Sequence, residues 1–229
     1  PPKLPSSGIK VQASAVAKTQ GVIRKQRLPL TQWDRALKRA IDLVGSSLLL
    51  AVSAPLILIL ALRIKLHDGG SAFFRRRVTG LKGEFDAFKL RTMVVGADEV
   101  LRRDPLLRRR FEMNYKLKDD PRITTVGTKL RRTGLDELPQ LWNVIKGEMS
   151  LVGPRMITPI ELKKYGDASW IFSEMKLGLT GYWQISRDQQ ASYDRRIEMD
   201  LFYIENWSLW FDLKILIKTP ARVLRGSGV

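Results

Sequence analysis

RRTGLDELPQLWNVIKGEMSLVGPR, residues 131–155, holds two adjacent carboxylates, Asp136 and Glu137, between basic residues on both sides. Pro139 lacks an N–H and is tolerated in the first turn of a helix, so we expect a helix that begins near Asp136 and runs to Ile145. Asp136 would then lie at or near the N-cap. Unpaired backbone N–H groups and the helix dipole there hold a carboxylate ionised and offer a phosphate a place to bind.

The spacing of this acid pair leaves two interpretations open. An Asp at a helix start followed by Glu is ordinary helix capping. In the alternative, the acids have different tasks, because neighbouring side chains on a helix point about 100° apart. One acid would attack a phosphorus atom while the other holds a metal ion or a proton.

The composition limits the chemistry that is available. The 229 residues include 40 Lys and Arg against 23 Asp and Glu, a formal net charge of +17. This charge favours an anionic partner: nucleic acid, phospholipid headgroups or a phosphorylated substrate. The chain has no cysteine and one histidine, His67. Cysteine chemistry is therefore excluded, a Ser-His-Asp triad or multi-histidine zinc site is not expected, and carboxylates, hydroxyls or lysines remain as catalytic groups.

Residues 33–68 are expected to form a membrane segment. The uncharged run 43–62 has 20 residues, just enough to span a hydrocarbon core as one helix. Pro55 lies slightly past its middle and removes a backbone hydrogen bond, and basic residues flank both ends. A re-entrant helix that breaks at Pro55 and returns to the same face explains these features. A kinked transmembrane helix explains the length equally well, so both interpretations remain open.

The rest of the chain predicts an α+β, membrane-associated monotopic domain. Residues 1–32, rich in Pro, Ser, Gln and Lys, are expected to form a flexible arm or linker. Residues 72–91 predict a hairpin with its turn at 80–83. Its basic run 75–77 could bind phosphate, but a solvated or lipid-facing strand edge is the expected role.

Two further segments are suited to a membrane interface. The stretch 96–118 is basic and amphipathic, and Trp207, Trp210 and Phe211 stand close to lysines near the end of the chain. A solvated helix face remains the alternative for the first segment, and a position in the core remains the alternative for the aromatic residues of the second. Residues 69–229 are therefore expected to form a cytoplasmic catalytic domain with interfacial helices and a small β region.

A set of short motifs makes the chain similar to a known family. They are KRAIDL (38–43), the proline-broken run around Pro55, FKLRTM (88–93), DPRITTVG (120–127), LRRTGLDELPQLWNVIKGEMSLVGPR (130–155), GLTGYWQ (178–184), SYDRR (192–196) and DLKIL (212–216). From about Leu37 to Val229 the chain resembles the bacterial sugar transferases, the monotopic polyprenyl-phosphate phosphoglycosyl transferases that begin exopolysaccharide, O-antigen and glycan assembly. The pairing of DELPQLWNV with KGEMSLVGPR is highly specific to this family.

The resemblance implies a role for each acid. Asp136 matches the nucleophile that attacks the β-phosphate of a UDP-sugar, releases UMP and carries the phosphosugar until polyprenyl phosphate takes it. Glu137 matches the second acid, which works with Mg²⁺, so the acid pair is also the expected metal site. The expected substrate- and phosphate-binding residues are Arg131, Lys89, Arg91, Gly153, Pro154 and Arg155.

The expected enzyme moves a hexose 1-phosphate, of the glucose or galactose type, from a UDP-sugar to polyprenyl (undecaprenyl) phosphate. It would work on the cytoplasmic face of a bacterial inner membrane, with Mg²⁺ and anionic lipids, without nucleic acid, and with self-association into a homodimer left open. Met156 and Ser186-Arg187-Asp188 depart from the family pattern, where Pro and Ser-Gly-Arg are commonest, so the sugar is not implied. A basic nucleic-acid-binding module and a non-catalytic membrane scaffold remain as alternatives; salt sensitivity and UDP-sugar turnover separate them.

Overall fold

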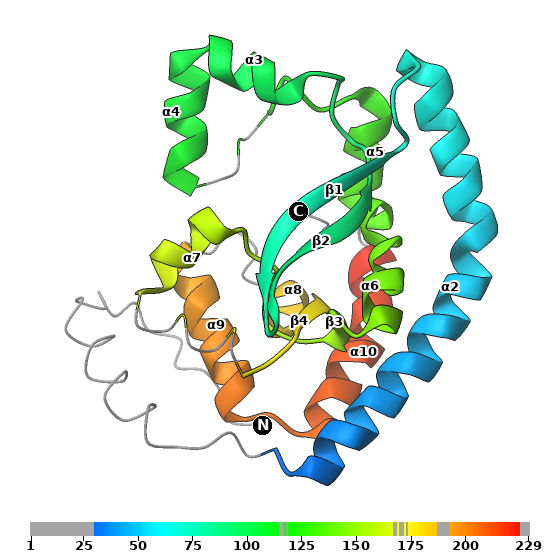
Figure 1. Ribbon diagram of the computed structural model, residues 1–229, viewed down its shortest axis with the longest axis vertical. Helices are drawn as coiled ribbons and strands as arrows, with labels where there is room; N and C mark the ends of the chain where they lie inside the picture. Colours follow the sequence, from blue (N-terminus) through cyan, green and yellow to red (C-terminus); the bar gives the residue numbers. More distant parts are fainter. Residues whose placement is uncertain are drawn as a thin grey trace.

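The computed structural model describes residues 30–114, 117, 119–166, 169, 172, 174–186 and 193–224. Within these residues, helices surround two small two-stranded sheets (Figure 1), which confirms the predicted mixed class. Nearly all of the predicted arm, 1–32, lies outside the described residues, as do Arg187 and Asp188. The elements are α2 (Gln32–Asp68), β1 (Phe73–Gly80), β2 (Gly83–Leu90), α3 (Ala97–Arg103), α4 (Pro105–Asn114), α5 (Thr125–Thr133), η1 (Leu135–Glu137), α6 (Gln140–Lys146), β3 (Met149–Val152), α7 (Pro159–Tyr165), β4 (Leu177–Thr180), α8 (Tyr182–Ile185), α9 (Tyr193–Glu205) and α10 (Leu209–Leu224).

The long helix α2 forms one side of the molecule and is drawn as a single curved ribbon (Figure 1). A capping box fixes its start: the Thr31 hydroxyl accepts from the Asp34 N–H at 3.1 Å, and the Asp34 carboxylate accepts from the Thr31 N–H at 2.9 Å. Gly69, with φ 71°, ends it. Pro55 cannot donate a helical hydrogen bond, yet the helix continues through it. The structure therefore does not confirm the break predicted at Pro55.

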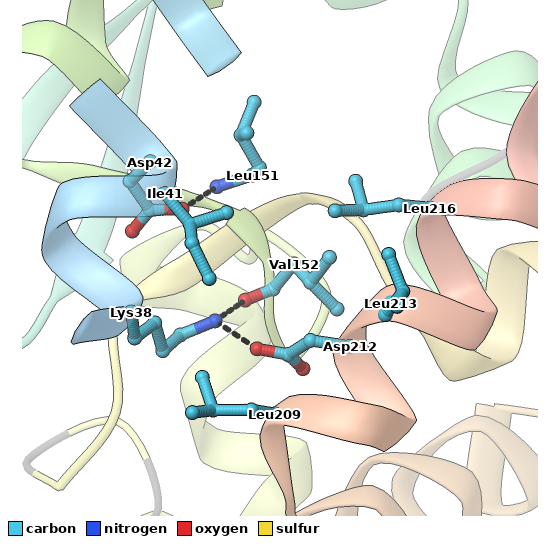
Figure 2. A pocket seen from close by; sticks show the side chains of 9 residues that line it. All are labelled: Lys38, Ile41, Asp42, Leu151, Val152, Leu209, Asp212, Leu213 and Leu216. Atoms are coloured by element: carbon cyan, nitrogen blue, oxygen red, sulfur yellow. Dashed lines mark hydrogen bonds and ion pairs between the residues drawn. The ribbon is translucent and has the colours of Figure 1, made fainter. Parts of the chain in front are cut away.

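The first turns of α2 are fixed to the domain by buried charges, shown in Figure 2. The Lys38 ammonium donates to the carbonyl of Val152 at 2.9 Å and lies 2.5 Å from the Asp212 carboxylate. One turn later, the Asp42 carboxylate accepts from the N–H of Leu151 at 2.9 Å. These contacts join α2 to β3 and to α10.

The second half of α2 contacts the same domain. Ile57, Ala61 and Ile64 form an apolar cluster with Leu90 of β2 and Leu130 of α5. By contrast, only 11% of the most apolar 18-residue window of α2 is buried, and this helix is long and apolar enough to cross a membrane. The exposed apolar surface is consistent with association with a membrane.

The hairpin β1–β2 is antiparallel, with Phe73 opposite Leu90 and Gly80 opposite Gly83, which confirms the predicted hairpin and turn. Side chains alternate between the faces of a strand, so Arg76 and Lys89 lie on the face that also carries buried core residues of both strands. This face packs toward α6 and η1. The hairpin thereby directs two cations toward the acid pair.

The parallel pair β3–β4 brings two distant motifs into close contact. The Gly153 N–H donates to the Thr180 carbonyl at 3.0 Å, and the Gly178 N–H donates to the Pro154 carbonyl at 2.9 Å. A Cβ on Gly178 would lie 2.1 Å from the Gly153 nitrogen. The loop after β3 therefore lies directly against the backbone around β4, and this packing requires glycine.

The described parts of the predicted interfacial segments are mostly helical. Within the stretch 96–118, residues 97–103 and 105–114 form α3 and α4, and α10 exposes Trp210, with the Lys214 ammonium 5.4 Å from its ring. Of the two positions left open for Trp207, the structure shows the core: its side chain is buried, and its Nε1–H donates to Asp212 at 3.3 Å. Contact of the other segments with a membrane stays a prediction.

Candidate active site

Asp136 and Glu137 lie in η1, a short 3-10 turn between α5 and α6. Gly134, with φ 68°, ends α5, and right-handed helical backbone continues through Leu138 and Pro139 into α6. The helical path thus starts close to the predicted place. Asp136 lies near the N-cap, as expected, but Gly134 occupies the cap position itself and no side chain caps the described turn.

Glu137 is held by a cation. The Lys89 Nζ lies 2.5 Å from Glu137 Oε1. Burial alone would raise the pKa of Glu137, but Lys89, followed by Arg155 and Arg76, lowers the pKa below its usual value. Glu137 is therefore ionised at neutral pH.

Asp136 has the opposite electrostatic character. Its side chain is 6% exposed, and burial raises its pKa; Lys89 and Arg131 oppose this rise, while the neighbouring Glu137 adds to it. Two adjacent acids whose pKa values move in opposite directions are suited to different tasks. Added positive charge at the site would favour the ionised, nucleophilic form of Asp136.

Arg131 and the loop 153–155 complete the basic surroundings of the acid pair. Arg131, in the last turn of α5, donates from Nε to the Thr92 hydroxyl at 2.8 Å, which orients its guanidinium. Arg155 follows Gly153 and Pro154 after β3 and is close enough to Glu137 to lower its pKa. The structure thus brings Lys89, Arg131 and Arg155 together around the acid pair.

Arg91, although predicted to bind phosphate, lies elsewhere. Its Nη1 donates to Asp68 at 2.7 Å and its Nε to the Ser71 carbonyl at 2.6 Å. These contacts fasten the end of α2 to the end of β2, so the structure does not bring Arg91 to the acid pair. Pro55, in the apolar part of α2, is also no part of this group of side chains.

Two residues near the acid pair were missed from the sequence. Arg76 donates to Glu161 at 3.1 Å and contributes to the lowered pKa of Glu137. Because side chains alternate along a strand, Arg76 points to the opposite face from Arg75 and Arg77. This alternation could have been read from the sequence. Gln140 lies one helical turn after Asp136, is 1% exposed, and its Nε2 has no hydrogen-bond partner among the described residues.

The acid pair fits a magnesium ion only in company with a substrate. In the described part of the chain, no group of three or more His, Asp or Glu side chains is placed to hold a metal. Mg²⁺ commonly binds through one or two carboxylates together with substrate phosphates and water. Asp136 and Glu137 supply the two carboxylates of such a site, and the substrate would supply the phosphate oxygens.

Asp200, another buried acid, gives a prediction about pH and stability. Burial raises its pKa from 3.8 to about 7, against the stabilising effects of Arg155, Tyr165 and Arg196. The folded protein therefore binds more protons than the unfolded chain between about pH 4 and about pH 7. Over this range, the contribution of Asp200 to the free energy of unfolding falls as pH rises, by at most about 1.4 kcal/mol per pH unit.

Asp200→Asn removes this dependence, so the Tm of the variant relative to the parent should rise between about pH 5 and about pH 8. Thermal unfolding in detergent at a series of pH values measures it. A Tm difference that does not change with pH would show that Asp200 does not titrate in this range.

Comparison with known proteins gives consistent relatives. A family model described as bacterial sugar transferase matches residues 33–226. The chain is 45% identical over 200 residues to the undecaprenyl-phosphate galactose phosphotransferase of Salmonella typhimurium, covering 85% of this chain and 42% of that protein. It is 39% identical over 210 residues to the undecaprenyl-phosphate glucose phosphotransferase of Komagataeibacter xylinus, covering 86% and 37%.

A relative of similar size shows the same likeness. The chain is 44% identical over 197 residues to the exopolysaccharide production protein ExoY of Rhizobium meliloti, covering 83% of this chain and 87% of ExoY. The chain therefore spans less than half of the two phosphotransferases and most of ExoY. Since the family model spans nearly all of the described residues, the chain belongs to the bacterial sugar transferase family.

Proposed function

We propose that this protein transfers a hexose 1-phosphate, of the glucose or galactose type, from a UDP-sugar to undecaprenyl phosphate and releases UMP. The observation that carries the proposal is the acid pair, buried Asp136 and partly exposed Glu137, among Lys89, Arg131 and Arg155. The names of the relatives, which are galactose and glucose phosphotransferases of undecaprenyl phosphate, support the donor and acceptor classes. A nucleic-acid-binding module is not supported, because the family match accounts for the basic charge and the acid pair together.

In the first half-reaction, a carboxylate oxygen of Asp136 attacks the β-phosphorus of the UDP-sugar. The oxygen–phosphorus bond to Asp136 forms, the bond from that phosphorus to the bridging oxygen breaks, and UMP leaves with the bonding electron pair. Arg131 and Arg155 stabilise the negative charge on the transferring phosphoryl group, while Lys89 keeps Glu137 ionised and oriented.

In the second half-reaction, a phosphate oxygen of undecaprenyl phosphate attacks the same phosphorus. The bond to Asp136 breaks, so the sugar becomes linked to the lipid through a diphosphate and the carboxylate is regenerated. Asp136 and Glu137 would hold Mg²⁺ together with the donor diphosphate; the ion, when bound, neutralises charge on the phosphoryl oxygens.

We also propose a position for α2: its exposed apolar face dips into the membrane, and both of its ends stay on the same, cytoplasmic face, although the helix curves through Pro55 without a break (Figure 1). The support is that both halves of α2 contact one domain, through Lys38 and Asp42 near its start and through Ile57, Ala61 and Ile64 near its end. A helix that crossed a bilayer of about 30 Å would separate these two groups of contacts by the hydrocarbon core.

Single cysteines test this position directly, since the chain has no other cysteine. Arg35→Cys and His67→Cys lie at exposed positions near the two ends of α2, and Arg103→Cys on α3 marks the side of the catalytic domain. In inner-membrane vesicles of known orientation, a membrane-impermeant maleimide should label all three from the cytoplasmic side. Labelling of positions 35 and 67 from opposite sides would establish a transmembrane helix instead.

Release of UMP from a panel of UDP-sugars tests the activity. We expect multiple turnovers with UDP-glucose or UDP-galactose only when undecaprenyl phosphate is present, loss of turnover in excess chelator, and recovery with Mg²⁺. Lys89→Gln should lower the rate by about 100-fold, whereas Lys82→Gln, an exposed lysine of the same hairpin, should not.

Each arm of this assay has its own contrary result. Absence of UMP with every UDP-sugar contradicts the proposed reaction. Full activity in chelator contradicts the role of Mg²⁺ alone, and equal losses in the two lysine variants contradict the role of Lys89.

A further inference from the structure

The loop 153–155 is fixed by a hydrogen bond to a buried carboxylate. Asp200 of α9 accepts the backbone N–H of Arg155, with distances of 3.2 Å to Oδ1 and 3.3 Å to Oδ2. Its side chain also accepts the Tyr165 hydroxyl of α7 at 3.1 Å. Asp200 is 1% exposed, so these contacts are shielded from water. Two separate helices thus converge on the residue that follows Gly153 and Pro154.

The Arg155 side chain is placed by the same surroundings. Its guanidinium lies 5.3 Å from the ring of Trp183, and the guanidinium of Arg196, one turn before Asp200, lies 4.5 Å from the same ring. Trp183 is fully buried. Guanidinium groups stack on indole faces, and a shared ring fixes their planes.

Two guanidinium groups on one buried ring repel each other unless an anion balances them. Both Arg155 and Arg196 interact electrostatically with Asp200. A contact that only joined α9 to the loop would not require this charge, because a neutral amide oxygen accepts the same N–H without the cost of burying a carboxylate. Where Asp200 is ionised, above its raised pKa of about 7, its charge is thus explained by the arginines that it faces.

We propose that Asp200 is a positioning residue for binding of the donor diphosphate: it fixes the backbone of Arg155 and balances its charge, so that the guanidinium faces the acid pair. This inference rests on the proposed function, since Arg155 is the residue that contacts the phosphates. Asp200 itself touches neither the substrate nor Asp136. Its effect passes through Arg155.

A double-mutant cycle on kcat/KM for the UDP-sugar tests that dependence. Arg155→Ala should lower kcat/KM by about 100-fold and Asp200→Ala by about tenfold. If Asp200 acts through Arg155, the double variant should be no worse than Arg155→Ala. Tyr165→Phe, which removes one hydrogen bond to Asp200 but keeps its charge and its contact with Arg155, should stay within about threefold of the parent.

Amide hydrogen exchange provides a readout that needs no activity. Pro154 has no N–H and the Gly153 N–H bonds to Thr180, so slow exchange at Arg155 reports its bond to Asp200. A peptide that covers 153–155 should exchange faster in Asp200→Ala than in the parent, and at the parent rate in Tyr165→Phe. If the alanine variant fails to fold, Asp200→Asn replaces it in the cycle, with the same outcome expected, and Asp200→Leu, which has no acceptor, replaces it in the exchange experiment.

Two outcomes would overturn the inference. The first is that the losses of kcat/KM in Asp200→Ala and Arg155→Ala multiply to about 1000-fold in the double variant. The second is that amide exchange over 153–155 is the same in Asp200→Ala as in the parent. If the parent releases no UMP from any UDP-sugar, the proposed function fails, and the exchange result alone then decides whether Asp200 positions the loop.

Discussion

The ion pair between Lys38 and Asp212 joins the three parts of the molecule on which the site depends. Lys38 belongs to the long apolar helix α2 and Asp212 to α10. The carbonyl of Val152, which Lys38 also contacts, belongs to the last residue of β3. Tyr203 and Trp207 donate to the same carboxylate at 2.7 and 3.3 Å, which satisfies its remaining oxygen sites. Removing one partner of such a buried pair commonly costs about 3–5 kcal/mol.

This contact has a direct consequence for the candidate active site. The residue after Val152 is Gly153, so the strand held by α2 leads without interruption into the loop that carries Arg155. On its other side the loop is held by Asp200. The position of α2 and the position of Arg155, for which we propose phosphate binding, are therefore set by one continuous group of contacts. The proposed transfer to a membrane-embedded acceptor would require such a connection between the lipid surface and the catalytic groups.

Local patterns predicted much of this structure. Hydropathy predicted the apolar helix over residues 43–62, and the glycines predicted the hairpin turn at 80–83. The missing N–H of Pro139 predicted the helical path around it. Each of these signals acts over a few residues. The motif around Asp136 also indicated the right family. Asp136 lies near the N-cap, as expected, while the cap position itself belongs to the left-handed Gly134.

Contacts between distant segments were not predictable in the same way. Arg91 pairs with Asp68, Trp207 lies in the core, and Asp200 contacts a loop 45 residues earlier. Charge and amphipathic spacing predict which side chains can be buried. They do not predict which residue, distant in the sequence, a buried side chain contacts. Buried acids of this kind are recognisable only once the packing around them is known.

The central claim is that Asp136, and not its neighbour, becomes covalently bound to the phosphosugar. Intact-protein mass spectrometry after incubation with a UDP-sugar, without undecaprenyl phosphate, measures this directly. We expect a sugar-phosphate adduct that maps to Asp136 in the parent, none on Asp136→Asn, and slow formation on Glu137→Gln. An adduct on Asp136→Asn, or one that maps to Glu137, would contradict the assignment.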